Sequence, residues 1–253
     1  LGLMVWQDMP SMRHDLQYGE IDLPGRVQFE QELSQMVLEH YNSPSIVLWV
    51  VFNESWGQFD TQRVVSNVMQ LDPSRLVTCA SGWDDYEVGH IIDTHHYPEP
   101  AAPTPTATRA AVNGEYGGIG YVIPGHIWGS VPWQGYANSE QVCSVYERYL
   151  CSLMDFKENP GLSAAIYTEI IDTELELVGF ATYDRKVIKV NEDRLAEANT
   201  QFNNSYTTLI PASDISGQTW KYTTVQPAAN WYMKGFNDSS WPQSQGGFGV
   251  AGG

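Results

Sequence analysis

Residues 46–54 read Ile-Val-Leu-Trp-Val-Val-Phe-Asn-Glu, and this stretch decides the predicted fold. Its seven apolar residues in a row predict a strand with both faces covered, as in a parallel sheet packed between layers. The run ends at Asn53 and Glu54. Because α/β barrels carry their functional side chains at the carboxyl ends of their strands, these two polar residues are the first candidates for a site.

Apolar runs alternate with segments of helical period on both sides of this stretch. The predicted strands cover residues 3–7, 46–52, 76–80, 91–95, 109–113 and 164–169, and the predicted helices cover 27–41, 61–71, 139–157 and 192–202. Such alternation indicates βαβ units around a parallel sheet. The sequence therefore predicts an α/β fold.

The six predicted strands fall two short of the eight in a (β/α)8 TIM barrel. The chain begins at Leu1, inside an apolar run and without an initiator Met. We therefore expect an incomplete barrel over residues 1–205, which lacks its first two strands because they lie upstream of Leu1.

Residues 206–253 follow a different pattern. Aromatic residues alternate there between Gly, Pro and Asn turns, in Trp220–Thr224, in Asn230–Tyr232 and in Phe236–Trp241. This pattern is typical of the opening strands of a β-sandwich. We predict the start of an accessory domain here, with sugar binding as one candidate role.

The charge of the chain limits its partners. Its 30 acidic and 13 basic residues give a formal net charge of -17, which repels phosphate backbones and anionic membranes. No run approaches the ~20 apolar residues of a membrane span. We expect a soluble protein with neither nucleic acid nor membrane as a partner. The compartment stays open, with secretion or a periplasmic place as candidates, and so does the oligomeric state.

A second acid, Glu115, follows the predicted strand 109–113. If this strand and strand 46–52 belong to one barrel, Glu115 and Glu54 face the same cleft. Paired carboxylates of this kind hydrolyse glycosidic bonds: one protonates the leaving oxygen and the other attacks the anomeric carbon or stabilises its charge. A lone Glu after a strand is more often a solvated strand end or a helix cap, so the pairing carries the argument.

Several segments, taken in order, resemble successive strand ends of glycoside hydrolase family 2, the β-galactosidase/β-glucuronidase family. They are Phe52-Asn53-Glu54-Ser55-Trp56-Gly57, His95-His96-Tyr97-Pro98, Gly114-Glu115-Tyr116-Gly117-Gly118, and Tyr167-Thr168-Glu169 through Thr182-Tyr183-Asp184-Arg185. The resemblance covers roughly residues 1–190. It adds an ordered set of motifs to the pattern of strands and helices.

The resemblance implies a TIM barrel that hydrolyses β-glycosides with retention of configuration, without a cofactor or a metal. It makes Glu54 the acid/base and Glu115 the nucleophile, and it makes Asn53 the partner of the sugar 2-hydroxyl. Retention requires carboxyl groups ~5 to 5.5 Å apart, whereas inversion requires ~6.5 to 9.5 Å. The acid/base has to be protonated near neutral pH, and the nucleophile has to stay ionised.

Other side chains are candidates for holding the sugar or the acids. Neighbouring residues of a strand point to opposite faces, so at most one of His95 and His96 enters the cleft, where sugar binding is a better reading than metal binding. Tyr97 or Tyr116 could donate a hydrogen bond to Glu115.

Tryptophans near the predicted strand ends could stack on a sugar ring. Trp83 follows a strand, and it could equally be a lid over the end of the barrel. Trp128 and Trp133 lie in the long loop after Glu115.

A second hypothesis differs in kind from the hydrolase. The chain could be a carbohydrate-binding or inactive barrel fragment without turnover, because an open barrel holds its acids less rigidly.

Overall fold

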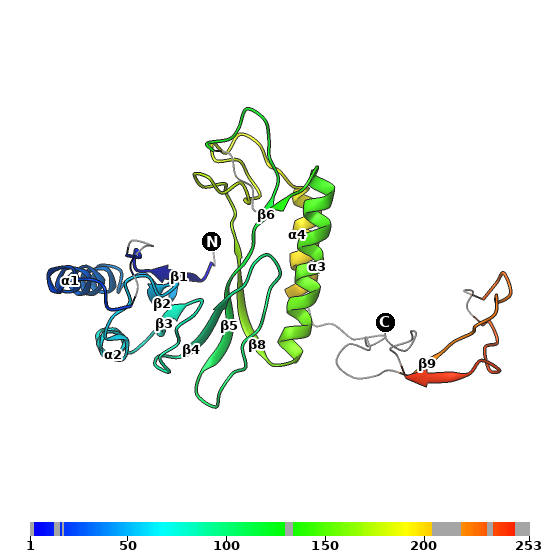
Figure 1. Cartoon of the computed structure of the whole chain (residues 1–253), viewed down its shortest axis with the longest axis horizontal. Helices are drawn as coiled ribbons and strands as arrows, with labels where there is room; N and C mark the ends of the chain where they lie inside the picture. Colours follow the sequence, from blue (N-terminus) through cyan, green and yellow to red (C-terminus); the bar gives the residue numbers. More distant parts are fainter. Residues whose placement is uncertain are drawn as a thin grey trace. The chain divides into compact units, whose positions relative to one another are not determined.

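A computed structural model describes residues 3–12, 16, 18–129, 134–203, 219–231 and 235–245. The chain divides into two compact units, Leu1–Asn203 and Asn204–Gly253, which are considered separately below (Figure 1). Among the residues that the structure describes, none of the helices combines the length and the hydropathy that a membrane crossing requires.

The first unit is built on six parallel strands. They are β1 (Val5–Asp8), β2 (Ile46–Asn53), β3 (Leu76–Ser81), β4 (Ile91–His95), β5 (Ala110–Gly117) and β8 (Leu162–Thr168). Hydrogen bonds join β1, β2 and β3 into one sheet and β4, β5 and β8 into another, and β3 contacts β4. The strands therefore follow one another in space in the order in which they follow in the sequence, which confirms the predicted α/β class with parallel strands.

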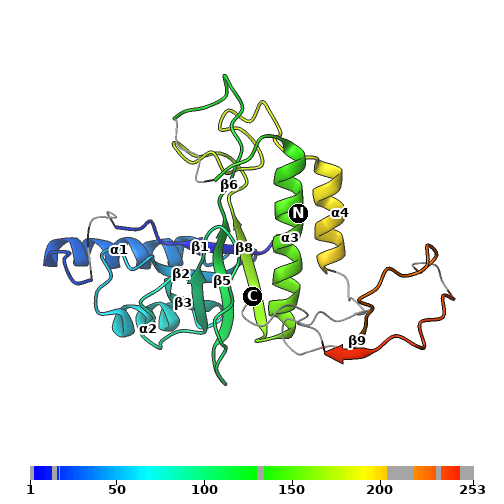
Figure 2. The ribbon, with the colours of Figure 1, turned by 45° about the vertical axis from the view of Figure 1, so that its right-hand side comes forward.

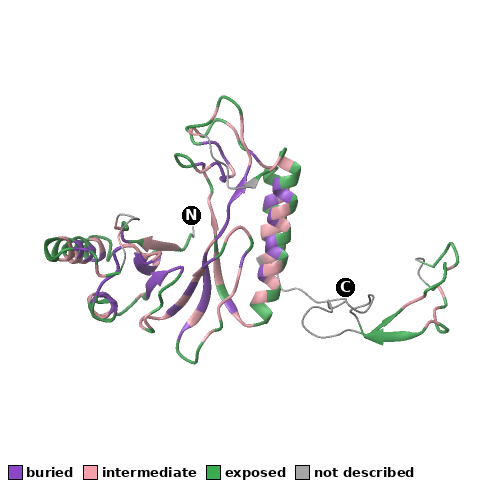
Figure 3. Cartoon of the chain, in the orientation of Figure 1, coloured by how far each residue is buried: buried purple, intermediate pink, exposed green. Residues whose placement is uncertain are grey.

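Four helices cover the outer faces of these strands. α1 (Leu23–Glu39) and α2 (Thr61–Leu71) lie beside β1 to β3, and α3 (Ser139–Glu158) and α4 (Glu192–Asn203) lie beside β8, as two views show (Figures 1 and 2). Figure 3 shows the buried residues of α3 along one stripe, with exposed residues on its other side. This is the amphipathic pattern of a helix packed on a sheet.

Three apolar clusters hold this unit together. One joins α1 and α2 to the outer face of β1 to β3, and a second joins α3 and α4 to β5 and β8. The third is small and consists of Leu48, Val50, Ile91 and Val112, with Trp6 packed against it. Because successive strand residues alternate between faces, this third cluster marks the face of the strands opposite to the helices.

Helix α1 begins before its predicted start at residue 27. Asp22 is its N-cap, and the Asp22 carboxylate accepts a hydrogen bond of 2.9 Å from the amide of Gly25. Pro24 lies in the first turn, where its missing N–H costs nothing. The Pro-Gly pair therefore starts this helix, although it looks like a helix breaker in the sequence.

Two further strands of the first unit, β6 (Ile119–Gly120) and β7 (Gln134–Gly135), form a short parallel pair in the loop after β5. In the second unit, β9 (Thr219–Lys221) pairs with β10 (Gln243–Gln245) in antiparallel fashion, and the residues of both strands are exposed. The predicted β-sandwich stays a prediction, since residues 204–218 and Tyr232 lie outside the described residues.

Candidate active site

The carboxyl ends of the parallel strands gather the polar side chains of the predicted site. β2 ends at Asn53, next to Glu54, β4 ends at His95, and Glu115 lies near the end of β5. The amide of Glu54 donates to the carbonyl of Ser81 on the neighbouring strand, at 2.9 Å. Glu54 itself has a φ of 48°, in the left-handed region, so the chain turns away from the sheet where this acid begins.

His95 brings the two acids together. Its Nδ1 lies 3.0 Å from Oε1 of Glu54 and 3.4 Å from Oε2 of Glu115. One oxygen of each carboxylate and one ring nitrogen of His95 all lie within 4.8 Å of one another. Two acids that are distant in the sequence therefore lie close together, on either side of one buried imidazole.

The His95 side chain is only 1% exposed, so its position is set by its surroundings. Gly82 leaves room for the ring, because a Cβ at Gly82 would lie 3.0 Å from Cγ of His95. Burial lowers the pKa of His95, but the hydrogen bond to Glu54 and the charges of Glu115 and Asp93 outweigh it and raise that pKa above its ordinary value. His95 is thus a buried group that favours a positive charge between two acids. His96 points away, is exposed, and bonds the carbonyl of Glu99.

Tyr97 resolves the choice between the two candidate tyrosines. Its hydroxyl donates a short hydrogen bond to Oε2 of Glu115. Tyr116 lies instead in the apolar cluster under α3, where its ring packs edge-on against Tyr149 and Tyr167. Burial raises the pKa of Glu115, and the positive charge of His95 and the Tyr97 hydroxyl both act against this rise. The pKa of Glu115 nevertheless stays above its ordinary value, because burial and the charge of Glu54 outweigh these two opposing effects.

Asp93 on the neighbouring strand holds the backbone next to Glu115 in place. The Asp93 carboxylate accepts a hydrogen bond of 2.6 Å from the amide of Gly114. A Cβ at Gly114 would lie 2.3 Å from an oxygen of Asp93, so this contact needs glycine. Burial raises the pKa of Asp93 to about 7. The side-chain amide of Asn113 also stabilises this backbone, because it donates to the carbonyls of Thr94 and Glu115, each at 2.8 Å.

Sequence reasoning missed Asp93, Asn113 and Gly114. One signal was available for Asp93: it precedes His95 by two residues in one strand, and this period of two places both side chains on the same face. Nothing in the sequence pattern indicates that Gly114 is required by the closeness of Asp93.

Asn53 is held beside Glu54 by Ser81, whose hydroxyl donates to Oδ1 of Asn53 at 2.8 Å. The Trp83 ring is 47% exposed and lies edge-on to His95, with the ring centroids 6.2 Å apart. The structure therefore brings Asn53, Tyr97, His95 and Trp83 to the two acids.

Trp128 is not part of this group in the described residues. Its ring is 68% exposed, and the aromatic partner of Trp128 is Tyr183, at a centroid distance of 5.7 Å. Trp133 lies outside the described residues.

Comparison of the chain with sequence families finds a match. The family described as "Glycosyl hydrolases family 2, TIM barrel domain" matches residues 4–116, the segment that contains both acids. Residues 4–116 are thus similar to the barrel domain of glycosyl hydrolase family 2. This match confirms the resemblance found in the strand-end motifs. No curated protein matches the chain in sequence.

Solved structures of several β-glycosidases share the fold of this chain. An FMN-binding β-glucuronidase from Facaelibacterium prausnitzii L2-6 is 18% identical with a TM-score of 0.55, over 79% of this chain and 35% of that one. A GH2 β-galacturonidase from Eisenbergiella tayi, bound to galacturonate, is 16% identical with a TM-score of 0.57, over 80% and 41%.

A putative β-galactosidase from Bacteroides fragilis is 15% identical with a TM-score of 0.54, over 81% of this chain and 34% of that one. The chain thus spans between about a third and two fifths of the length of these three proteins. At these identities the likeness shows the fold alone.

The three side chains that meet at the strand ends could also hold a cation. Glu54, His95 and Glu115 each offer one ligand atom, and two carboxylates with an imidazole suit a divalent transition metal. The expectation that the site works without a metal stays a prediction.

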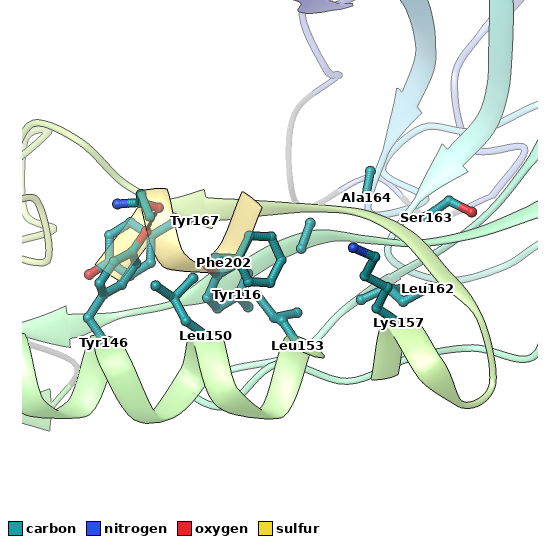
Figure 4. A pocket seen from close by; sticks show the side chains of 12 residues that line it. Tyr116, Tyr146, Leu150, Leu153, Lys157, Leu162, Ser163, Ala164, Tyr167 and Phe202 are labelled. Carbon is teal, nitrogen blue, oxygen red and sulfur yellow. Dashed lines mark hydrogen bonds between the residues drawn. The ribbon is translucent and has the colours of Figure 1, made fainter. Parts of the chain in front are cut away.

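A cavity of about 340 Å³ has a lining that does not include the strand-end acids. It lies between α3, α4 and β8, is partly open to solvent, and is lined by side chains such as Tyr146, Leu150, Leu153, Tyr167 and Phe202 (Figure 4). Its lining contains neither Glu54 nor Glu115. It belongs to the packing between helices and sheet.

Proposed function

We propose that the protein hydrolyses O-glycosidic bonds of β-glycosides with retention of configuration, and that Glu54 and Glu115 carry out the reaction. One observation carries this proposal: an oxygen of each acid lies within 4.8 Å of the other and of a ring nitrogen of His95. The family 2 match and the family 2 hydrolases among the structural neighbours support the same chemistry.

In the first step, the ionised Glu115 attacks the anomeric carbon, while the protonated Glu54 donates its proton to the departing oxygen. A glycosyl-enzyme ester forms on Glu115, and the leaving alcohol is released. In the second step, Glu54 takes a proton from water, which attacks the same carbon and frees Glu115. Two inversions give net retention.

The other side chains have supporting roles in this proposal. Tyr97 donates to the Glu115 oxygen and keeps the carboxylate oriented. Asn53, held by Ser81, is placed to bond the sugar 2-hydroxyl, a contact that strengthens in the oxocarbenium-like transition state. Trp83 has an exposed ring beside His95, on which a sugar ring can stack.

We further propose that the six parallel strands correspond to the last six of the eight strands of a TIM barrel. Their order in space and the family 2 barrel match support this correspondence. Residues 206–253 would then begin the accessory β-sandwich domain.

Turnover of nitrophenyl β-glycosides by the full-length natural protein tests the proposal. We expect release of nitrophenol from at least one β-glycoside, and NMR is expected to show the β-anomer of the sugar as the first product. Absence of turnover across a panel of β-linked sugars, or an α-anomer as the first product, would contradict it.

Replacing Tyr97 with Phe removes the hydroxyl that bonds Glu115. Because this hydroxyl acts against the rise in the pKa of Glu115, the variant's Glu115 should hold its proton up to a higher pH. Only the ionised carboxylate attacks, so the acid limb of the kcat/KM profile is expected to move to higher pH. At the optimum, kcat/KM should fall about 10- to 100-fold, the effect of a hydrogen bond to a charged group. An unmoved acid limb would contradict this role of Tyr97.

A further inference from the structure

His95 contacts both reacting acids, yet the proposed reaction gives it no role. Its side chain is 1% exposed, and its Nδ1 lies 3.0 Å from Oε1 of Glu54 and 3.4 Å from Oε2 of Glu115. The contact with Glu54 is a hydrogen bond, and the contact with Glu115 is within ion-pair distance. One nitrogen of a buried ring therefore meets an oxygen of each acid.

The surroundings of the ring hold it in this position. Strand β4 has an irregular register between Thr94 and His95, after which His95 pairs with Glu115 on β5. Such irregularities change the direction in which a side chain points. Gly82 leaves room for the ring, since a Cβ there would lie 3.1 Å from Nδ1 of His95, and the Trp83 ring lies edge-on to it. The imidazole is thus packed so that Nδ1 faces the acids.

Nδ1 of His95 carries a hydrogen in this arrangement. A bare Nδ1 would direct its lone pair at oxygens of Glu54 and Glu115, and an ionised carboxylate can only accept. Nε2 is buried and has no hydrogen-bond partner among the residues that the structure describes, so a hydrogen placed there instead would lack an acceptor. In the neutral ring and in the charged ring alike, an Nδ1–H faces the two acids.

The donors of the site distinguish the oxygens of the two acids. The Tyr97 hydroxyl and Nδ1 of His95 both reach Oε2 of Glu115, and Nδ1 also reaches Oε1 of Glu54. In the part of the chain that the structure describes, these contacts leave Oε1 of Glu115 and Oε2 of Glu54 for the substrate. Because a hydrogen-bonded oxygen has fewer lone pairs left for reaction, the two remaining oxygens are the ones suited to react.

We propose that His95 is the positioning residue of the reacting pair: its Nδ1–H orients both carboxylates, so that Oε1 of Glu115 attacks the anomeric carbon and Oε2 of Glu54 carries the transferred proton. The inference rests on the proposed function, because it takes these two acids as the reacting pair.

The first step shows what this position achieves. The bond from Oε1 of Glu115 to the anomeric carbon forms while the glycosidic bond breaks, and the proton on Oε2 of Glu54 passes to the departing oxygen. Negative charge is thereby lost from Glu115 and gained by Glu54. Since the Nδ1–H of His95 faces both acids, the donor need not move as the charge does. His95 keeps its own hydrogen throughout.

Removing the ring and returning it in solution tests this role. In the full-length natural protein, His95→Ala should lower kcat/KM about 10- to 100-fold, the effect of a hydrogen bond to a charged group. Added imidazole should restore most of the loss, because it fits the space of the side chain and supplies an N–H. Thiophene, a ring of similar size without an N–H, should restore none. His96→Ala is the matched control: this exposed neighbour should keep the wild-type kcat/KM with or without imidazole.

The outcomes separate the inference from the proposed function. Equal rescue by thiophene, or a wild-type kcat/KM in His95→Ala, would reduce His95 to packing and overturn the inference, while the hydrolase would stand. A wild-type protein that turns over no sugar would overturn the proposed function instead.

NMR of the wild-type protein with isotopically labelled histidine tests the donor without turnover and without a His95 variant that has to fold. The His95 signals are those that shift in Glu54→Gln. We expect a hydrogen on Nδ1, at the low field typical of a hydrogen bond to a carboxylate. A bare Nδ1 would overturn the inference, whether or not the protein turns over a substrate.

A crystal structure of the glycosyl-enzyme trapped with a 2-deoxy-2-fluoro sugar tests the assignment of the oxygens. The ester is expected on the Glu115 oxygen that Tyr97 and His95 do not contact, with the carbonyl oxygen still bonded to the Tyr97 hydroxyl. An ester through the contacted oxygen would show that the donors do not select the reacting atom and would overturn the inference.

Discussion

Replacing Glu115 with Gln is expected to lower kcat on every β-glycoside by about 10⁴-fold or more, because the amide cannot form the glycosyl ester. The structure places Glu115 so that little else changes: His95 can still reach Glu54, and Tyr97 can still bond the amide oxygen. Steady-state kinetics on a nitrophenyl substrate measures the loss, and KM or inhibitor binding should change far less than kcat.

Glu158→Gln is the matched control for this prediction. Glu158 ends α3, is exposed and should leave kcat at the wild-type level. If Glu115→Gln kept more than a tenth of the wild-type kcat, another group would have to be the nucleophile.

Replacing Glu54 with Gln is expected to divide substrates by their leaving groups. Loss of the proton donor should slow substrates with poor leaving groups, such as alkyl glycosides and disaccharides, by 10² to 10⁴-fold, the usual range for general acid catalysis. Activated aryl glycosides such as the 2,4-dinitrophenyl compounds need no proton on departure. For them formation of the glycosyl-enzyme should stay near the wild-type rate, and its hydrolysis should become rate-limiting.

A burst of dinitrophenol followed by a slow steady state is the expected signature. It measures the two steps separately in one experiment. Equal losses on good and poor leaving groups, with no burst, would remove the acid/base role from Glu54 and leave it a structural partner of His95.

The sequence predicts the order of the strands and the acids at their ends, because apolar runs and the periodicity of apolar residues are local signals. The apolar run before Asn53 specifies β2, and the bounds of α2 and β4 agree with those predicted from periodicity. Parallel strands then place Glu54 and Glu115 at one end of the sheet without any further information.

Features that depend on close approach could not be predicted. The sequence predicts that this strand ends at Asn113, before a Gly-containing loop, but β5 continues to Gly117 with an irregular register between Asn113 and Tyr116. Gly114 is there because the Asp93 carboxylate fills the space of a side chain. A close contact between two strands does not change the local sequence pattern of either strand, so it cannot be predicted from that pattern.

The central position of His95 also lay beyond sequence reasoning. Alternation allowed one of two adjacent histidines into the cleft, but only the structure shows the ring bonded to both acids. The choice between Tyr97 and Tyr116 depended in the same way on which face of the strands each residue joins.

Trapping the glycosyl-enzyme tests most directly the claim that Glu115 and Glu54 form a retaining pair. A 2-deoxy-2-fluoro β-glycoside with a dinitrophenyl leaving group should accumulate the ester, because fluorine at C2 destabilises the oxocarbenium-like transition state of both steps. Mass spectrometry of a digest is predicted to find one sugar on the peptide that contains Glu115, and none in Glu115→Gln. A sugar on a peptide without Glu115, or no adduct on a wild-type protein that turns over its substrate, would contradict the account.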